Sequence, residues 1–295
     1  MKKLILATGA HRSGSTWTGR IISSAPGVRY IHEPFNQRRE NSPLIYWFEY
    51  LSENTDKKHQ EKVKSYIESY YSISLKTTIN RALRISSHKH FYHFMVDLKK
   101  RITDRTLIKD PIAIMSAEWL YNSMNCDVVI SIRHPAAFIA SLKVKKWEFD
   151  FNNYLNQDAL MKRYLVYYYD EIREYSNNKK NIIEQGILLW NTIYATIHQY
   201  KEKYQNEWYF VRHEDLSNDP LIEFKNMFDY LNLEFHESVK DEIINSSTAK
   251  NESDLKRNSK ENIFNWKNRL SEHEITLIKE KTKPTWTKFY TEKDW

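Results

Sequence analysis

The sequence has few of the residues that usually cross-link or interrupt a chain. Its 295 residues include one cysteine, five glycines and seven prolines. The single Cys126 cannot form an intramolecular disulfide, and no Cys/His cluster has the spacing of zinc ligands, so no metal site is predicted. Because the chain also lacks a flexible glycine/serine linker, we expect one domain over residues 1–295.

Long hydrophobic runs are missing as well. The apolar start from Leu4 to Ala7 is too short for a signal peptide, and no stretch approaches the ~18 apolar residues of a membrane span. We therefore expect no transmembrane segment and a cytoplasmic location. A catalytic fragment of a larger membrane-anchored enzyme would have the same features.

Acidic residues are outnumbered by basic ones. The formal net charge is +7 and the isoelectric point about 9.1, which favours anionic partners such as nucleotides, acidic glycans, nucleic acid or an anionic membrane surface. The basic residues are spread through the chain without a block of five or more like charges, so a nucleic-acid-binding tail is not expected. The 41% of hydrophobic residues indicates an ordinary packed core.

Short apolar runs alternate with helical patterns along the chain. Strands are predicted at 4–7, 105–108, 127–132 and 207–211, with a shorter one at 28–31. This alternation predicts an α/β fold of three layers, with a central, mostly parallel sheet between helices and the ligands at the strand ends. Two tyrosine-rich segments, 43–100 and 147–204, are expected to be mostly helical insertions.

The strongest motif is residues 9–16, Gly-Ala-His-Arg-Ser-Gly-Ser-Thr, between the first predicted strand and the first predicted helix. Glycines allow a tight turn that points backbone N–H groups at a phosphate, and the N-terminus of a helix adds further donors. The spacing matches the nucleotide-binding loop G-x-x-x-x-G-K-[ST], except that Ser15 replaces the lysine. The missing lysine argues against ATP or GTP hydrolysis.

A second candidate anion site follows the predicted strand at 127–132. Arg133 would lie at the strand end, Pro135 suits the first turn of a helix, and Ser141 lies two helical turns further on. The planar fork of Arg133 and the hydroxyl of Ser141 are suited to holding one phosphate.

Together these two motifs resemble those of the sulfotransferases that use 3′-phosphoadenosine 5′-phosphosulfate (PAPS). The resemblance is closer to the bacterial and carbohydrate-modifying type than to the cytosolic small-molecule type. The resemblance implies a three-layer P-loop-type fold, PAPS as sulfonate donor, PAP as product and no metal requirement. In the family, Arg-[Ser/Thr]-Gly-[Ser/Thr]-Thr grips the 5′-phosphosulfate, and an arginine with a serine eight residues later binds the 3′-phosphate. The donor-binding residues implied here are His11, Arg12, Ser13, Gly14, Ser15, Thr16, Trp17, Arg133, Ser141 and Arg257.

Two further segments extend the resemblance. Residues 212–216, Arg-His-Glu-Asp-Leu, follow a predicted strand and are expected to serve as scaffold. Arg257 lies where the family places a basic loop over the 3′-phosphate, but Ser259 stands in place of the glycine often found there. A solvated arginine is an equally good interpretation of Arg257.

The candidate catalytic residues are Glu33, Lys109 and Arg12. In-line sulfonate transfer needs a base for the acceptor and positive charge at the sulfonate. Glu33-Pro34 after the short predicted strand resembles the glutamate base of bacterial members, whereas His32 should face the opposite way along an extended chain. Lys109 ends another predicted strand and is a candidate contact for the sulfonate or the acceptor; alternatively it is a surface lysine paired with Asp110.

The acceptor is expected to offer a hydroxyl or amine, on a carbohydrate or another small molecule. Two other functions remain open at this point. A P-loop-type kinase or phosphotransferase would need the missing lysine and a carboxylate for magnesium. A polyanion-binding module without catalysis would leave the loop and the Arg133/Ser141 pair unexplained.

Overall fold

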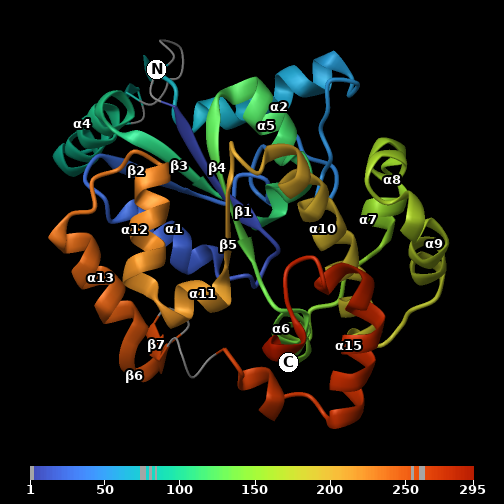
Figure 1. Cartoon of the computed structure of the whole chain (residues 1–295). Coiled ribbons are helices and arrows are strands. Elements are labelled where there is room, and N and C mark those ends of the chain that lie inside the picture. The colour runs from blue at the N-terminus through green and yellow to red at the C-terminus, as the bar shows by residue number, and fades with distance from the viewer. Residues whose placement is uncertain (1–2, 74–77, 80–81, 84, 254–255, 259–262) are drawn as a thin grey trace.

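A five-stranded parallel sheet forms the centre of the molecule (Figure 1). The computed structural model describes residues 3–73, 78–79, 82–83, 85–253, 256–258 and 263–295, with the backbone alone for 248–253 and 256–258. The strand order is β2-β3-β1-β4-β5. The strands are β1 (Leu4–Gly9), β2 (Val28–His32), β3 (Arg105–Lys109), β4 (Cys126–Ile132) and β5 (Tyr209–Arg212). The predicted α/β fold class and all five predicted strands are confirmed.

Both faces of the sheet are covered because its strands are apolar on both sides. In β1, Leu4 and Leu6 pack into one hydrophobic core, while Ile5 and Ala7 pack into the other. The second core is closed by α1 (Ser15–Ser23), α11 (His213–Asn218), α12 (Pro220–Tyr230) and α13 (Glu237–Ser247). The first is closed by α2 (Lys57–Ser69), η1 (Pro111–Ser116), α5 (Ala117–Met124), α6 (Pro135–Lys145), α10 (Ile182–Tyr204) and α15 (Glu272–Trp286).

The two predicted insertions contain further helices. The first has no helix before residue 57, and then forms α2 and α4 (His88–Thr103). The second forms α7 (Asn152–Leu155), α8 (Asp158–Arg163), η2 (Val166–Tyr168), α9 (Tyr169–Asn177) and α10. The chain closes with β6 (Thr248–Ser253), β7 (Lys256–Asn258), η3 (Asn265–Asn268), α15 and η4 (Glu292–Asp294). Among the described residues, none of these helices has the length and apolar character of a membrane span.

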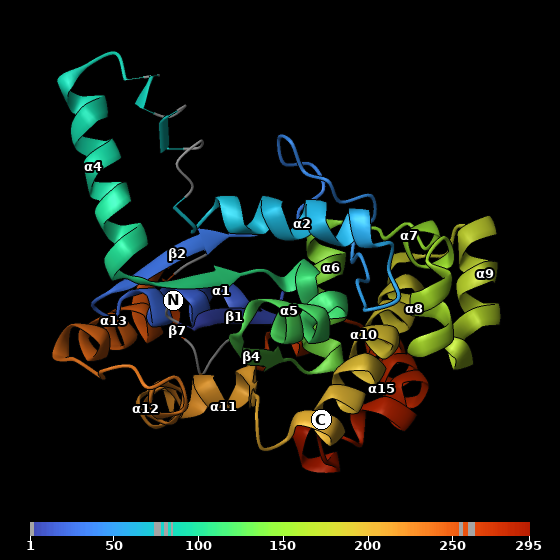
Figure 2. The same cartoon turned by 90° about the horizontal axis from the view of Figure 1, so that it is seen from above.

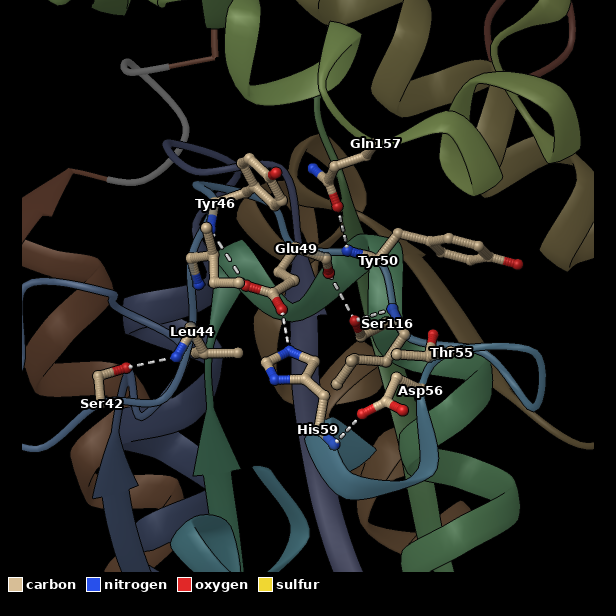
Figure 3. A network of polar contacts seen from close by, with 12 residues as sticks. Ser42, Leu44, Tyr46, Glu49, Tyr50, Thr55, Asp56, His59, Ser116 and Gln157 are labelled. Carbon is tan, nitrogen blue, oxygen red and sulfur yellow. Dashed lines mark hydrogen bonds and ion pairs between the residues drawn. The ribbon is translucent and has the colours of Figure 1, made fainter. Parts of the chain in front are cut away.

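A buried carboxylate organises the non-helical stretch before α2 (Figure 3). Glu49 is 4% exposed; its carboxylate accepts hydrogen bonds from the backbone N–H groups of Ile45 and Tyr46 and lies 2.5 Å from His59 Nε2. Ser116 of η1 donates to the Glu49 carbonyl at 2.5 Å. These bonds hold the neighbouring Phe48 in the core, where its ring lies 5.7 Å from the ring of His11. The stretch thereby forms a wall beside the loop that follows β1.

The strand order also determines where a ligand can bind. After the central β1 the chain crosses to β2 at one edge, and β4 lies on the other side of β1. In open parallel sheets, ligands bind at the carboxyl ends of the strands, where the connections diverge. The predicted phosphate-binding loop, residues 9–16, is called the phosphate loop below. It follows such a strand, and so do Glu33 and Arg133, while Lys109 ends one.

Candidate active site

The loop between β1 and α1 turns tightly, in the manner of an anion-binding loop. Ser13 N–H donates to the Ala10 carbonyl at 3.1 Å, and α1 begins directly after Gly14, whose φ is 87°. Arg12 has a φ of 64°, which is uncommon for a residue with a side chain. A residue in this conformation has to be held by its surroundings, and such strain concentrates at functional sites.

Two glycines are required by close packing in this loop. A Cβ at Gly9 would lie 2.4 Å from the Ser131 carbonyl oxygen at the end of β4. A Cβ at Gly14 would lie 2.3 Å from His213 Nδ1. The loop therefore rests directly on β4 and on the start of α11.

The two predicted anion motifs meet in the structure. Arg12 Nε donates to Ser141 Oγ of α6 at 2.8 Å, and Arg133 Nη1 donates to the Arg12 carbonyl at 2.6 Å. Helix α10 fixes the Arg133 backbone, because the Tyr194 hydroxyl accepts from its N–H at 2.7 Å and the Trp190 indole donates to its carbonyl at 3.1 Å. Residues 129 positions apart in sequence thus form one continuous cationic site.

Several polar atoms of this site are buried without a hydrogen-bond partner among the described residues. They are Arg133 Nε, Ser13 Oγ and Thr18 Oγ1. Buried polar groups are nearly always paired, so unpaired donors gathered around a glycine loop fit an anionic ligand. Burial also lowers the pKa of the Arg133 guanidinium.

His11 and Trp17 make contacts that the sequence did not reveal. The His11 ring packs against Phe138 and Trp147, and burial, followed by the charge of Arg12, lowers its pKa to about 4. His11 is therefore neutral, and its buried Nδ1 has no hydrogen-bond partner among the described residues. The Trp17 indole donates to Ser246 of α13 at 2.9 Å.

Glu33 and Lys109 form an ion pair at the ends of β2 and β3. Lys109 Nζ lies 2.5 Å from Glu33 Oε1, and the side chain of Lys109 is 1% exposed. Glu33 N–H also donates to the Lys109 carbonyl at 2.8 Å. Lys109 is therefore buried and paired with Glu33, so the alternative of a surface lysine paired with Asp110 is wrong.

The expectation that His32 faces away from Glu33 is also wrong. Its Nε2 lies 3.7 Å from Glu33 Oε2. The alternation of side chains holds only within an extended strand, whereas β2 ends at His32 and Glu33 has a φ of 43°. Burial, followed by the charge of Lys109, lowers the pKa of His32, so a neutral imidazole stands beside the carboxylate.

Asp110 was not identified as a site residue from the sequence, yet it joins three elements. Its carboxylate accepts from Phe35 N–H at 2.5 Å and from Ile112 N–H at 2.9 Å, while its own N–H donates to the Ala7 carbonyl. Complete burial raises its pKa to about 7, against the opposing effect of the Phe35 hydrogen bond. The Asp110-Pro111 pair, which is typical of a helix start, was the signal that the sequence offered.

His213 was expected to be part of the scaffold, but it reaches the phosphate loop. Its Nδ1 is buried without a partner in the described part of the chain, and its ring lies edge-on to that of Trp17 at 6.1 Å. The next residue, Glu214, accepts from His134 N–H at 3.0 Å and from the Tyr290 hydroxyl at 2.9 Å. Glu214 therefore has the structural role expected of this segment.

The other predicted donor-binding residues are placed as follows. Ser15 is buried in the first turn of α1, and Thr16 beside it is exposed. The backbone of Arg257 lies in β7, but its side chain is outside the described residues, as is all of Ser259. Across the described ranges, no group of three or more His, Cys, Asp or Glu side chains is arranged to hold a metal ion.

Several solved structures are similar to this chain. The sulfotransferase domain from the curacin biosynthetic pathway has a TM-score of 0.51 and 14% identity, over 96% of this chain and 98% of that one. The sulfotransferase domain of the Synechococcus PCC 7002 olefin synthase has a TM-score of 0.45 and 15% identity, over 94% and 92% of the two chains. Sulfotransferase STF9 from Mycobacterium avium has a TM-score of 0.48 and 9% identity, over 99% and 78%. No curated protein sequence matches.

The identity to the curacin-pathway domain is 14%, so this likeness shows the fold alone. The family is shown by the sequence itself. A family model described as a sulfotransferase domain matches residues 2–293, which is nearly the whole chain. The protein therefore belongs to the sulfotransferase family.

Proposed function

We propose that this sulfotransferase moves a sulfonate from PAPS to a hydroxyl or amine of its acceptor, with Glu33 as the base. The observation that carries the proposal is the convergence of Arg12, Arg133 and Ser141 into one site. PAPS has two separate anionic groups, and both motifs that would hold them lie at the same edge of the sheet.

The donor would be held mainly through its charges. The glycine loop and the N-terminus of α1 supply N–H donors for the 5′-phosphosulfate. Arg133 and Ser141 supply a charged fork and a hydroxyl for the 3′-phosphate. His213 Nδ1, which faces Gly14, adds an unpaired polar atom on the side of Trp17.

The chemistry would take place between Glu33, Lys109 and Arg12. The acceptor oxygen forms a bond to sulfur while the bond from sulfur to the phosphate oxygen breaks, and PAP leaves with the negative charge. The Glu33 carboxylate takes the proton from the acceptor hydroxyl. Lys109, which lies 2.5 Å from Glu33, and Arg12 stabilise the charge that builds up on the sulfonate and on the leaving oxygen.

We infer a carbohydrate-like acceptor from the aromatic edge of this site. Trp147 is 48% exposed, and the Arg12 guanidinium lies 5.6 Å from its ring centroid. An exposed indole next to a catalytic group presents a flat apolar surface that suits the face of a sugar ring. A screen of hydroxyl-bearing acceptors with labelled donor identifies the substrate.

The decisive test compares PAP with ATP as a stabilising ligand. Thermal unfolding is followed with PAP in the absence of magnesium and with ATP in its presence, because a ligand that binds the native state raises the Tm. We expect stabilisation by PAP without magnesium, and transfer of label from PAPS to an acceptor. Stronger protection by magnesium and ATP would instead support a phosphotransferase. Binding of PAP without transfer to any acceptor would support a binding module.

A further inference from the structure

Helix α4 exposes its apolar face, whereas an ordinary surface helix buries it. Phe91, Met95 and Ile102 share one face by their helical spacing and are 53%, 46% and 64% exposed. Tyr92 beside them is 67% exposed, and no residue of α4 is buried. Figure 2 shows α4 projecting from the edge of the sheet where β2 lies. A surface helix normally turns its apolar stripe toward the core, so the apolar face here is turned outward.

Polar contacts of Asp97 and Arg101 tie α4 to the body of the protein. Asp97 forms an ion pair with Arg29 of β2 at 3.0 Å and with Arg101 at 2.9 Å. Arg101 Nη1 also donates to the carbonyls of Ser69 and Ser72, at 2.9 and 3.1 Å. By their helical spacing, Asp97 and Arg101 lie on a different side of the helix from the apolar face. These bonds fix the orientation in which the apolar face points outward.

Helix α4 itself carries a net positive charge. Residues 88–103 contain four lysines and arginines and one acidic residue, a net charge of +3. The exposed lysines of α4 are Lys89, Lys99 and Lys100.

We propose that α4 is a docking surface for an anionic lipid bilayer. An amphipathic helix that combines exposed aromatic and aliphatic side chains with lysines binds in the plane of the interface, through apolar burial and attraction to acidic headgroups. The charge complementarity favours the bilayer over an apolar protein groove, which would leave the net charge of +3 on α4 unmatched. Because Asp97 and Arg101 bond the polar side of the helix to the protein, the apolar side can enter the membrane interface without breaking these bonds. This proposal does not rest on the identity of the sulfonate donor.

Vesicle sedimentation of the full chain tests the proposal. Vesicles of phosphatidylcholine alone are compared with vesicles that also contain phosphatidylglycerol. We expect binding to the anionic vesicles that weakens as salt is raised, and little binding to the neutral ones. The triple variant Phe91→Ser, Met95→Ser, Ile102→Ser should bind about tenfold more weakly or worse. The variant Lys89→Glu, Lys99→Glu, Lys100→Glu should lose binding to a similar or greater degree.

Matched control changes are available elsewhere on the surface. Tyr167 and Ile222 are 95% and 61% exposed, in η2 and α12, and Tyr167→Ser with Ile222→Ser should bind as the unmodified protein does. A second measurement places a fluorophore at Met95→Cys or at Tyr167→Cys, with the buried Cys126 protected from labelling. A blue shift on adding anionic vesicles is expected at position 95 only.

Three results would overturn the proposal. The first is equal binding to neutral and anionic vesicles, or to neither. The second is unchanged binding by both α4 triple variants, or a blue shift at position 167 as large as at 95. The third is a dimer in solution that the apolar triple variant dissociates, since the face would then be covered by a second copy of the chain.

Discussion

Glu33 and His32 show how a single backbone angle changes which side chains meet. Both lie at the end of β2, and the positive φ of Glu33 brings the two side chains together on the same edge. Of the two, we propose Glu33 as the base, because the contact of its carboxylate with the buried Lys109 and the bond of its backbone to β3 hold it in place. His32 is the more exposed side chain, at 54% against 23% for Glu33.

At this scale the first prediction concerns the base. Glu33→Gln keeps the size of the side chain but removes its ability to accept a proton, so kcat for sulfonate transfer should fall by about a hundredfold or more. The Kd for PAP, measured by calorimetry, should stay within about twofold. His32→Gln is the matched control and should retain most activity. Loss of activity in His32→Gln with retention in Glu33→Gln would assign the base to His32.

The second prediction concerns the two arginines of the anion site. Arg12→Ala and Arg133→Ala each remove a charge-assisted contact, so each should weaken PAP binding by about ten- to a hundredfold. Arg163→Ala in α8, whose guanidinium lies 4.9 Å from the Tyr164 ring, is the control and should leave the Kd for PAP unchanged. PAP binding that survives both substitutions would place the donor elsewhere.

At the scale of elements, helix α1 is packed against β3 without room for a methyl group. A Cβ at Gly19 would lie 2.8 Å from Lys109 Cγ and 3.1 Å from Tyr30 Cε2. Glycine in the middle of a helix usually weakens it by about 1 kcal/mol relative to alanine. Its presence here is explained by the path of Lys109, which runs past α1 to reach Glu33.

The third prediction follows from this packing. Gly19→Ala should lower the free energy of unfolding by about 1–3 kcal/mol in urea titrations, and should reduce transfer because it displaces Lys109. Gly27 has a φ of 73°, and a Cβ there would meet no atom within 4 Å, so it is the control for a glycine with free space around it. Gly27→Ala should cost about 1 kcal/mol from backbone strain and leave kcat unchanged. A more stable Gly19→Ala protein would contradict this account.

At the scale of the whole molecule, buried histidines couple stability to pH. Burial lowers the pKa of His11 to about 4 and that of His134 to about 3, against an ordinary value of 6.5. The unfolded chain therefore binds protons between pH 6.5 and 4 that the native state does not, and stability is lost as the pH falls. Asp110 acts in the opposite direction, because its raised pKa lets the native state bind a proton first.

The fourth prediction isolates one of these groups. The His134 ring stacks on Trp266 at 5.3 Å, and neither of its nitrogens has a partner among the described residues, so His134→Phe should fold. Between about pH 6 and 4 the free energy of unfolding should decline less steeply in the variant, by about 1.4 kcal/mol per pH unit. Urea titrations at several pH values measure the two slopes. Equal slopes would mean that His134 is already protonated in the native state.

Much of this fold and part of the site follow from local sequence. The five strands are short apolar runs, and the phosphate loop is a fixed spacing of glycines and hydroxyl-bearing residues. Both can therefore be recognised from the sequence alone. The motif around Arg133 and Ser141 is equally local, because eight residues on a strand-to-helix junction determine which way both side chains point. The resemblance to sulfotransferases depended on these features, and the family match over residues 2–293 confirms it.

Other features were decided only by tertiary structure, because they depend on which distant atoms meet. Lys109 pairs with Glu33 and not with the adjacent Asp110. The reason is that β3 lies between β2 and β1, and the Lys109 side chain extends past Gly19 toward Glu33. His213 became part of the site because the phosphate loop packs on α11. The outward apolar face of α4 is the clearest case: its amphipathic pattern is local, but its direction is set by the ion pairs of Asp97 with Arg29 and Arg101.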